Sequence, residues 1–283
     1  DLELSFLDEP EPLWALLEAL MARLFERHLG VKLETPFPRL THAEVMDRFG
    51  SDKPDLRVGL ELVELTGDVQ DSAFRVFSAT AASGGVVKGL RVPGAADTNR
   101  NALDGLEALA KEKGAGGLMW VRLKPEGPDS PVAKHVEPET LQRVVERLGA
   151  QNGDLLLLCA GPRRVVNEAL GALRLEAGRR HGLIQPGWRF LWVHDFPLFA
   201  WDEEAKRLVS EHHPFTSAKH EDLPLLEREP LKARANGYDL VLNGIELGSG
   251  SIRIHTPEMQ SRIFELLEIT PEEAEAKFGF FLK

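Results

Sequence analysis

Two carboxylates lie on either side of a predicted turn near the end of the chain, Asp239 and Glu246. Asn243-Gly244 between them favours a two-residue type I′ hairpin, because both turn positions need a positive φ. This turn would place Val241 opposite Glu246, with Asp239 on the same face. Two like charges so close repel each other unless a cation lies between them. Their oxygens would suit Mg²⁺ that carries a nucleotide phosphate.

A cation and an imidazole could complete such a site. Arg253 follows a Gly-Ser-Gly run at residues 248–250. Strict alternation puts Arg253 on the face opposite Glu246, but a bulge at the glycines would bring it to the carboxylate side. There it could hold a substrate carboxylate through two hydrogen bonds. His212, in a strand expected over residues 208–215, carries an imidazole that can donate a hydrogen bond to a carboxylate.

Structural interpretations of the same residues stay open. Charged residues that alternate on a hairpin usually form its solvated face, and Gly-Ser-Gly often marks only a bend. His212 and His213 lack a third ligand at the spacing of a zinc site. The glycines fit neither a Walker loop nor a dinucleotide-binding fingerprint. Cys159, the single cysteine, reads as a small buried hydrophobe.

The pattern of apolar residues predicts an α+β chain. Leu2, Leu4 and Phe6 alternate with polar residues, which predicts a strand, and the spacing over residues 11–29 predicts an amphipathic helix ended by Gly30. The alternation of strands and helices in the middle predicts a compact α+β or α/β module. Further strands are expected near residues 74–78, 86–92, 117–123, 154–160, 189–194 and 208–215, and helices near 41–49, 100–112, 138–148, 162–180 and 257–267.

Charge divides the 283 residues into three parts. Residues 1–59 carry 7 basic and 12 acidic side chains, residues 60–184 carry 16 of each, and residues 185–283 carry 11 and 17. Two acidic flanks around a neutral middle predict one domain interrupted by an insertion at 60–184. No part is basic enough for charge alone to indicate nucleic-acid binding. Apolar runs are too short for a membrane span, and the lack of a signal peptide favours the cytoplasm.

Eight runs of sequence together resemble bacterial-type aspartyl-tRNA synthetase, a class II enzyme. They are residues 1–6, 50–57, 130–134, 171–175, 191–197, 212–217, 238–244 and 246–255. They follow the family's order across essentially the whole chain, although the family often has three successive glycines at 248–250. The resemblance implies an antiparallel catalytic sheet with flanking helices, interrupted by an inserted α/β module, the GAD domain.

The resemblance also implies roles for particular residues. Asp1 would help to hold the ammonium group of aspartate, His212 would contact the bound aspartate, and Arg253 would pair with its side-chain carboxylate. Asp239 and Glu246 would hold Mg²⁺ and ATP. The implied reaction joins L-aspartate to AMP as aspartyl-adenylate and transfers it to the 3′ end of a tRNA, in a cytoplasmic homodimer.

Two other classes of function remain open. Residues 60–184 could form a non-catalytic tRNA-binding or docking module, or the parent could be an asparagine synthetase-like paralogue that releases free asparagine. The acidic hairpin with His212 and Arg253 favours a synthetase. The family's anticodon-binding domain, its motif 1, most of motif 2 with its ATP-binding arginine and the motif 3 arginine have no counterpart here. We therefore expect a portion of a larger enzyme that does not activate aspartate alone. These residues leave open whether the tRNA is that of aspartate or also of asparagine.

Overall fold

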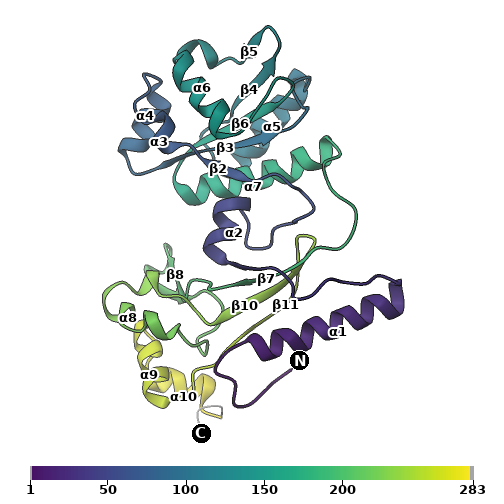
Figure 1. The fold of residues 1–283 in the computed structure, drawn as a ribbon. Helices are drawn as coiled ribbons and strands as arrows, with labels where there is room; N and C mark the ends of the chain where they lie inside the picture. Colours follow the sequence, from purple (N-terminus) through teal and green to yellow (C-terminus); the bar gives the residue numbers. More distant parts are fainter. Residues whose placement is uncertain (1, 281–283) are drawn as a thin grey trace. The chain divides into compact units, whose positions relative to one another are not determined.

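A computed structural model describes residues 2–280 and separates into two units (Figure 1). Unit 1 comprises Asp1–Ala43, Phe190–Leu242 and Glu246–Lys283, within the described range, and unit 2 comprises Glu44–Arg189 with Asn243–Ile245. Both combine helices with mainly antiparallel sheets, which confirms the predicted α+β class.

Unit 1 is built on a four-stranded sheet in the order β1-β7-β10-β11, and β8 and β9 form a separate hairpin. β1 runs parallel to β7, whereas β10 is antiparallel to β7. Helix α1 covers one sheet face, and α9 and α10 follow the last strand. The bounds are α1 Glu11–Leu29, β1 Arg39–Thr41, β7 Phe190–His194, β8 Phe199–Asp202, β9 Arg207–Ser210, α8 Leu225–Arg228, β10 Gly237–Leu242, β11 Ile245–Ser251, α9 Pro257–Leu266 and α10 Pro271–Phe278.

Aromatic side chains attach α1 to the sheet. The Trp14 ring stacks on that of Trp192 with centroids 5.2 Å apart, and meets the Tyr238 ring edge-on at 5.6 Å. Glu18, from the same helix face, is buried, and its carboxylate accepts hydrogen bonds from Trp192 Nε1 (3.0 Å) and the Phe37 backbone N–H (3.2 Å). Both hydrogen bonds reach Oε1, and they make the buried carboxylate compatible with the aromatic core.

Unit 2 contains a five-stranded sheet in the order β2-β3-β6-β4-β5, and all its strand pairs are antiparallel. Because every strand pair is antiparallel, the module is of the α+β type and not of the parallel α/β type. Both faces of the sheet are buried in hydrophobic cores, which explains the continuous apolar run of β6. The bounds are α2 His42–Phe49, β2 Leu62–Glu64, α3 Thr66–Val69, α4 Arg75–Ala82, β3 Val86–Val92, α5 Arg100–Glu112, β4 Met119–Lys124, β5 Gly127–Asp129, α6 Pro138–Arg147, β6 Leu155–Gly161 and α7 Arg163–Arg180.

Three expected strands differ from the structure. Residues 2–6 form no strand, and Phe6 is fully exposed, because alternation specifies a strand only where a neighbouring strand pairs with it. The segment expected as a strand at 74–78 begins helix α4, in which the rings of Phe74 and Phe77, at helical spacing, meet edge-on at 5.1 Å. The strand expected over 208–215 ends at Ser210, four residues before Pro214, which cannot donate to a ladder.

The predicted hairpin turn is present at Asn243 and Gly244, with φ of 52° and 84°. Asn243 Oδ1 accepts from the Arg189 N–H (2.9 Å), and Nδ2 donates to the Gly187 carbonyl (3.1 Å). We expect Asn243→Ala to lower the free energy of unfolding by about 2 kcal/mol, since it loses both bonds and strains the backbone. Asn243→Gly keeps the backbone conformation and should cost about 1 kcal/mol. Denaturant unfolding measures both, and equal losses would contradict the backbone contribution.

Candidate functional site

A cavity of about 460 Å³ lies in unit 1, between residues 2–7, the first turns of α1 and the end of β11. Leu13 and Leu17 of α1 form an apolar wall. Tyr238 lines it from the sheet, and Arg253 and His255 line it from the segment after β11. The cavity therefore combines an apolar wall with a cation and an imidazole, which suits a small polar ligand that carries a negative charge.

Gly250 packs closely against Tyr238 where the end of β11 lines this cavity. A methyl group at Gly250 would lie 2.7 Å from the Tyr238 ring, so this strand position tolerates only glycine. Beyond Ser251, the backbone of Arg253 forms an isolated antiparallel β-bridge with that of Thr216. The Arg253 side chain donates from Nη1 to Ser251 Oγ (2.8 Å). Among residues 2–280 the structure gives Arg253 no carboxylate within ion-pair distance. Its guanidinium thus retains a charge that an anionic ligand can neutralise.

The two adjacent histidines have different surroundings. Both rings are exposed and neither lines the cavity, but the His212 ring lies against Phe196, with centroids 4.6 Å apart. His213 Nδ1 accepts from the Phe215 N–H (3.3 Å). Burial lowers the pKa of His213 below its ordinary value, and the nearby Arg253 cation lowers it further. His213 is therefore close enough to Arg253 for the two charges to interact. Sequence reasoning missed it because strand alternation admits one histidine of the pair, whereas both lie in a loop.

The acidic residues of the hairpin lie outside the lining of this cavity. Asp239 is buried on β10 opposite Val193, and its neighbours Tyr238 and Leu240 pack toward α1, so Asp239 belongs to the other sheet face. Glu246 is exposed near the start of β11. Tyr238 and Arg253 therefore line the cavity, and the two carboxylates are not among its lining residues.

Two further acidic residues come from the start of the chain. Asp1, expected to hold the aspartate ammonium, lies outside the described residues. Glu3 lines the cavity and was missed by sequence reasoning, because in an alternating segment its charge indicates only an exposed strand face. Its position in the first of the eight matching runs is the signal that could have identified it.

Metal binding was tested against the donors that are present. Within residues 2–280, no three His, Cys, Asp or Glu side chains cluster as a metal site. Asp239 and Glu246 supply hard oxygen donors from adjacent strands. Mg²⁺ typically takes one or two carboxylates and completes its shell with phosphate oxygens and water. Two carboxylates are the kind of donor that Mg²⁺ takes together with a phosphate, and they are too few for a metal held by protein ligands alone.

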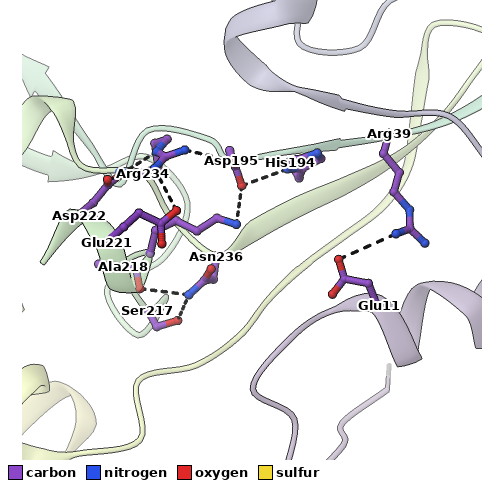
Figure 2. Close-up of polar contacts among 11 residues, drawn as sticks. Glu11, Arg39, His194, Asp195, Ser217, Ala218, Glu221, Asp222, Arg234 and Asn236 are labelled. Carbon is purple, nitrogen blue, oxygen red and sulfur yellow. Dashed lines mark hydrogen bonds and ion pairs between the residues drawn. The ribbon is translucent and has the colours of Figure 1, made fainter.

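An ionic network holds the loops of unit 1 beside the end of β7 (Figure 2). The Asp195 carboxylate contacts His194 Nδ1 (3.0 Å), Lys219 Nζ (2.7 Å) and Arg234 Nη1 (3.5 Å). Arg234 also pairs with Asp222, Nε to Oδ2, at 2.7 Å. Because Asp195 and Asp222 are largely buried, the network ties the segment 217–236 to the sheet more firmly than a surface ion pair would.

The same network predicts acid-sensitive stability. Burial favours the neutral form of Asp195, but hydrogen bonds from His194 and Lys219 outweigh it and hold the pKa of Asp195 below its ordinary value. The stabilisation is therefore complete above the unfolded-state pKa and is lost as pH falls through the folded-state pKa. We expect Asp195→Asn to lower the midpoint denaturant concentration at pH 7 and to have a smaller effect near pH 3. An equal loss at both pH values would contradict this linkage.

Comparison with known proteins identifies the family. Residues 1–283 match the family described as tRNA synthetases class II (D, K and N). The chain belongs to this family. The match confirms the resemblance to class II synthetases and places the chain among the aminoacyl-tRNA synthetases, a family of ligases. None of the helices within residues 2–280 has the length and apolar character needed to cross a membrane.

Among class II synthetases, several curated relatives align with the entire chain. The aspartate–tRNA(Asp/Asn) ligase of Moorella thermoacetica is 50% identical over 283 residues, which is 47% of that protein. The ligase of the same name from Caldanaerobacter subterraneus subsp. tengcongensis is 47% identical over 48% of its length, and that from Heliobacterium modesticaldum is 48% identical over 47%. The chain thus spans about half the length of the curated relatives it matches.

Proposed function

We propose that this chain is part of an aspartate–tRNA ligase that uses ATP to convert L-aspartate to aspartyl-adenylate and transfers the aspartyl group to tRNA. The family match and the names of the relatives support the class of reaction. The structural observation that carries the choice of substrate is Arg253, which lines a cavity with no described carboxylate in ion-pair contact. A substrate that presents a second carboxylate would satisfy this guanidinium through two hydrogen bonds.

In this proposal the residues of the cavity bind and orient aspartate. Arg253 holds the side-chain carboxylate, and Tyr238 closes the cavity from the sheet. His213 lies outside the cavity lining, and burial together with the Arg253 cation lowers its pKa and so favours its neutral form. His212, which lies outside the cavity lining, is proposed from the family resemblance to contact the bound aspartate, and Asp1 to contact its ammonium group. Such binding leaves the α-carboxylate free to react, and orientation is the principal contribution of a site of this kind.

Two nucleophilic displacements follow in the proposed reaction. A carboxylate oxygen of aspartate attacks the α-phosphorus of ATP, and the bond to pyrophosphate breaks. A hydroxyl group at the tRNA 3′ end then attacks the carbonyl carbon of the adenylate, and AMP leaves with the bonding electrons. The protein contributes by alignment and by neutralisation of negative charge during both displacements.

Asp239 and Glu246 are proposed to hold the nucleotide. Class II synthetases in general use ATP and Mg²⁺. The two carboxylates lie on neighbouring strands and fit the donor requirement of Mg²⁺ together with phosphate oxygens. Bound Mg²⁺ would neutralise charge on the phosphates, while the two side chains fix its place on the hairpin.

The partners of the proposed ligase are a tRNA and a second protomer. The relatives are named for both aspartate and asparagine tRNAs, so we propose that both are substrates. We further propose a cytoplasmic homodimer in which residues 60–184, within unit 2, form the inserted GAD module. Residues 1–59 and 185–283 would belong to the catalytic domain.

A non-catalytic docking module is the second candidate. Unit 2 has its own sheet with a hydrophobic core on each face, so it has the features of an independently folding domain. This candidate predicts that the separate unit binds tRNA and that the parent protein catalyses nothing. The cavity of unit 1 that Arg253 lines favours the ligase over the docking module.

The decisive experiment measures aspartate-dependent ATP–pyrophosphate exchange in the full-length protein that contains this chain. We expect exchange with L-aspartate and none with L-asparagine, followed by charging of aspartate tRNA. The 283-residue chain alone is the matched control, in which we expect no exchange. Release of free asparagine, or tRNA binding without exchange by the full-length protein, would refute the proposal.

A further inference from the structure

One face of helix α7 receives the segment Gly50–Leu60. Gly171 and Gly178 lie seven residues apart on this face. A side chain at Gly171 would collide with the Gly50 backbone, and a methyl group at Gly178 would lie 2.9 Å from Val58 Cγ1. The two glycines therefore allow the segment to lie directly on the helix.

Arg174 lies between these glycines on the same face and is 1% exposed. Its Nε donates to the Leu60 carbonyl (2.5 Å), and its Nη2 donates to the carbonyls of Asp55 (2.9 Å) and Val58. The guanidinium carbon lies 4.9 Å from the centre of the Phe49 ring. Burial lowers the pKa of Arg174 to about 10, so the side chain stays charged at neutral pH. All these hydrogen bonds go to backbone carbonyls, so Arg174 fixes the path of the segment.

The fixed segment meets the tip of the β10–β11 hairpin. A methyl group on Gly244 would lie 3.2 Å from Asp55 Cβ, which shows how closely the tip approaches. Asp55 itself is held by a two-pronged ion pair, in which Arg57 Nε and Nη2 lie 3.0 and 2.7 Å from its carboxylate oxygens. The tip residues Asn243–Ile245 accordingly group with unit 2, while the strands that they join belong to unit 1.

We propose that Arg174 is a positioning residue for nucleotide binding: through the Asp55 segment it supports the hairpin at Gly244, and the hairpin carries Asp239 and Glu246. This inference rests on the proposed function, because it assigns a nucleotide to those two carboxylates. Arg174 lies outside the cavity lining, and the backbone of the segment Gly50–Leu60 links it to the hairpin.

The effect should differ between the two substrates. Glu246 lies two residues from Gly244, so a displaced tip moves its carboxylate directly. Arg253 lies beyond the glycines of β11 and has its own bridge to Thr216. Loss of Arg174 should therefore weaken binding of Mg·ATP and leave aspartate binding nearly unchanged.

The first test uses the 283-residue chain and limited trypsin digestion at the Arg57–Val58 bond. Release of the segment in Arg174→Met should raise the initial rate of this cleavage by about 10-fold, because cleavage follows local opening. Arg164→Met, which removes an exposed arginine from the same helix, should leave the rate unchanged. An unchanged rate in Arg174→Met would overturn the anchoring contact.

The second test measures steady-state exchange in the full-length ligase. We expect Arg174→Met to raise the KM for Mg·ATP by about 10-fold and the KM for aspartate by less than about 2-fold. Arg174→Lys should have an intermediate effect, because it keeps the charge but loses the planar set of guanidinium donors. Gly244→Ala, which disturbs the contact from the hairpin side, should show the same split. A lower kcat with both KM values unchanged would indicate loss of folded enzyme alone and would overturn the positioning role. Absence of exchange in the unmodified enzyme would overturn the proposed function as well.

Discussion

Arg253→Met in the full-length ligase should lower kcat/KM for aspartate in ATP–pyrophosphate exchange by roughly 100- to 1,000-fold, the loss expected when one member of a desolvated charge pair is removed. Arg253 lines the cavity and has no described carboxylate in ion-pair contact, so a ligand carboxylate would be its charged partner. Arg253→Lys should recover little of the loss, because an ammonium group cannot make two parallel hydrogen bonds. Exchange kinetics at varied aspartate concentration measure both variants.

The control for Arg253 is another arginine of unit 1. Arg262 pairs with Glu227 at 3.0 Å and lies outside the cavity lining, so Arg262→Met should change kcat/KM by less than about 2-fold. The KM for ATP should be nearly unaffected in Arg253→Met, since we assign the nucleotide to the hairpin carboxylates. If Arg253→Met retains normal kcat/KM for aspartate, the cavity is not the aspartate site.

Trp192→Ala should lower the free energy of unfolding of unit 1 by about 3–5 kcal/mol, the range for truncation of a large aromatic in a core. Trp192 is 1% exposed and stacks on Trp14, so its removal leaves a cavity between α1 and the sheet. The variant also removes one of the two donors to the buried Glu18 carboxylate. Denaturant unfolding followed by circular dichroism measures the loss, with separate transitions fitted for the two units.

Two variants separate the causes of this loss. Trp192→Phe keeps most of the apolar contact but removes the N–H donor, so it should cost about 1–3 kcal/mol. Trp201→Ala truncates a tryptophan that is 46% exposed and should cost less than about 1 kcal/mol. Equal losses for Trp192→Phe and Trp192→Ala would contradict a packing contribution and assign the whole effect to Glu18.

Interactions between residues close in the sequence explain why helices α5 and α7 and the hairpin turn were predicted correctly. The helices expected at 100–112 and 162–180 agree with α5 and α7, since apolar spacing and caps act within a few residues. The hairpin turn at Asn243-Gly244 is equally local. The strand expected at residues 2–6 failed because a strand also needs a neighbour, and apolar alternation does not specify one.

For the site, the residue types alone indicated an arginine, imidazoles and an acidic hairpin, and the ordered motifs indicated the class II family. The tertiary structure decided which of them share a cavity: Arg253 joins Tyr238, while Asp239 lies on the other sheet face. It also placed Arg253 near His213, so that the cation lowers the pKa of this histidine. The physical reason is that periodicity sets which side chains share a face, but the segments that cover the face come from distant parts of the chain. The carbonyls held by Arg174 show this most clearly, because backbone acceptors leave no mark in a sequence.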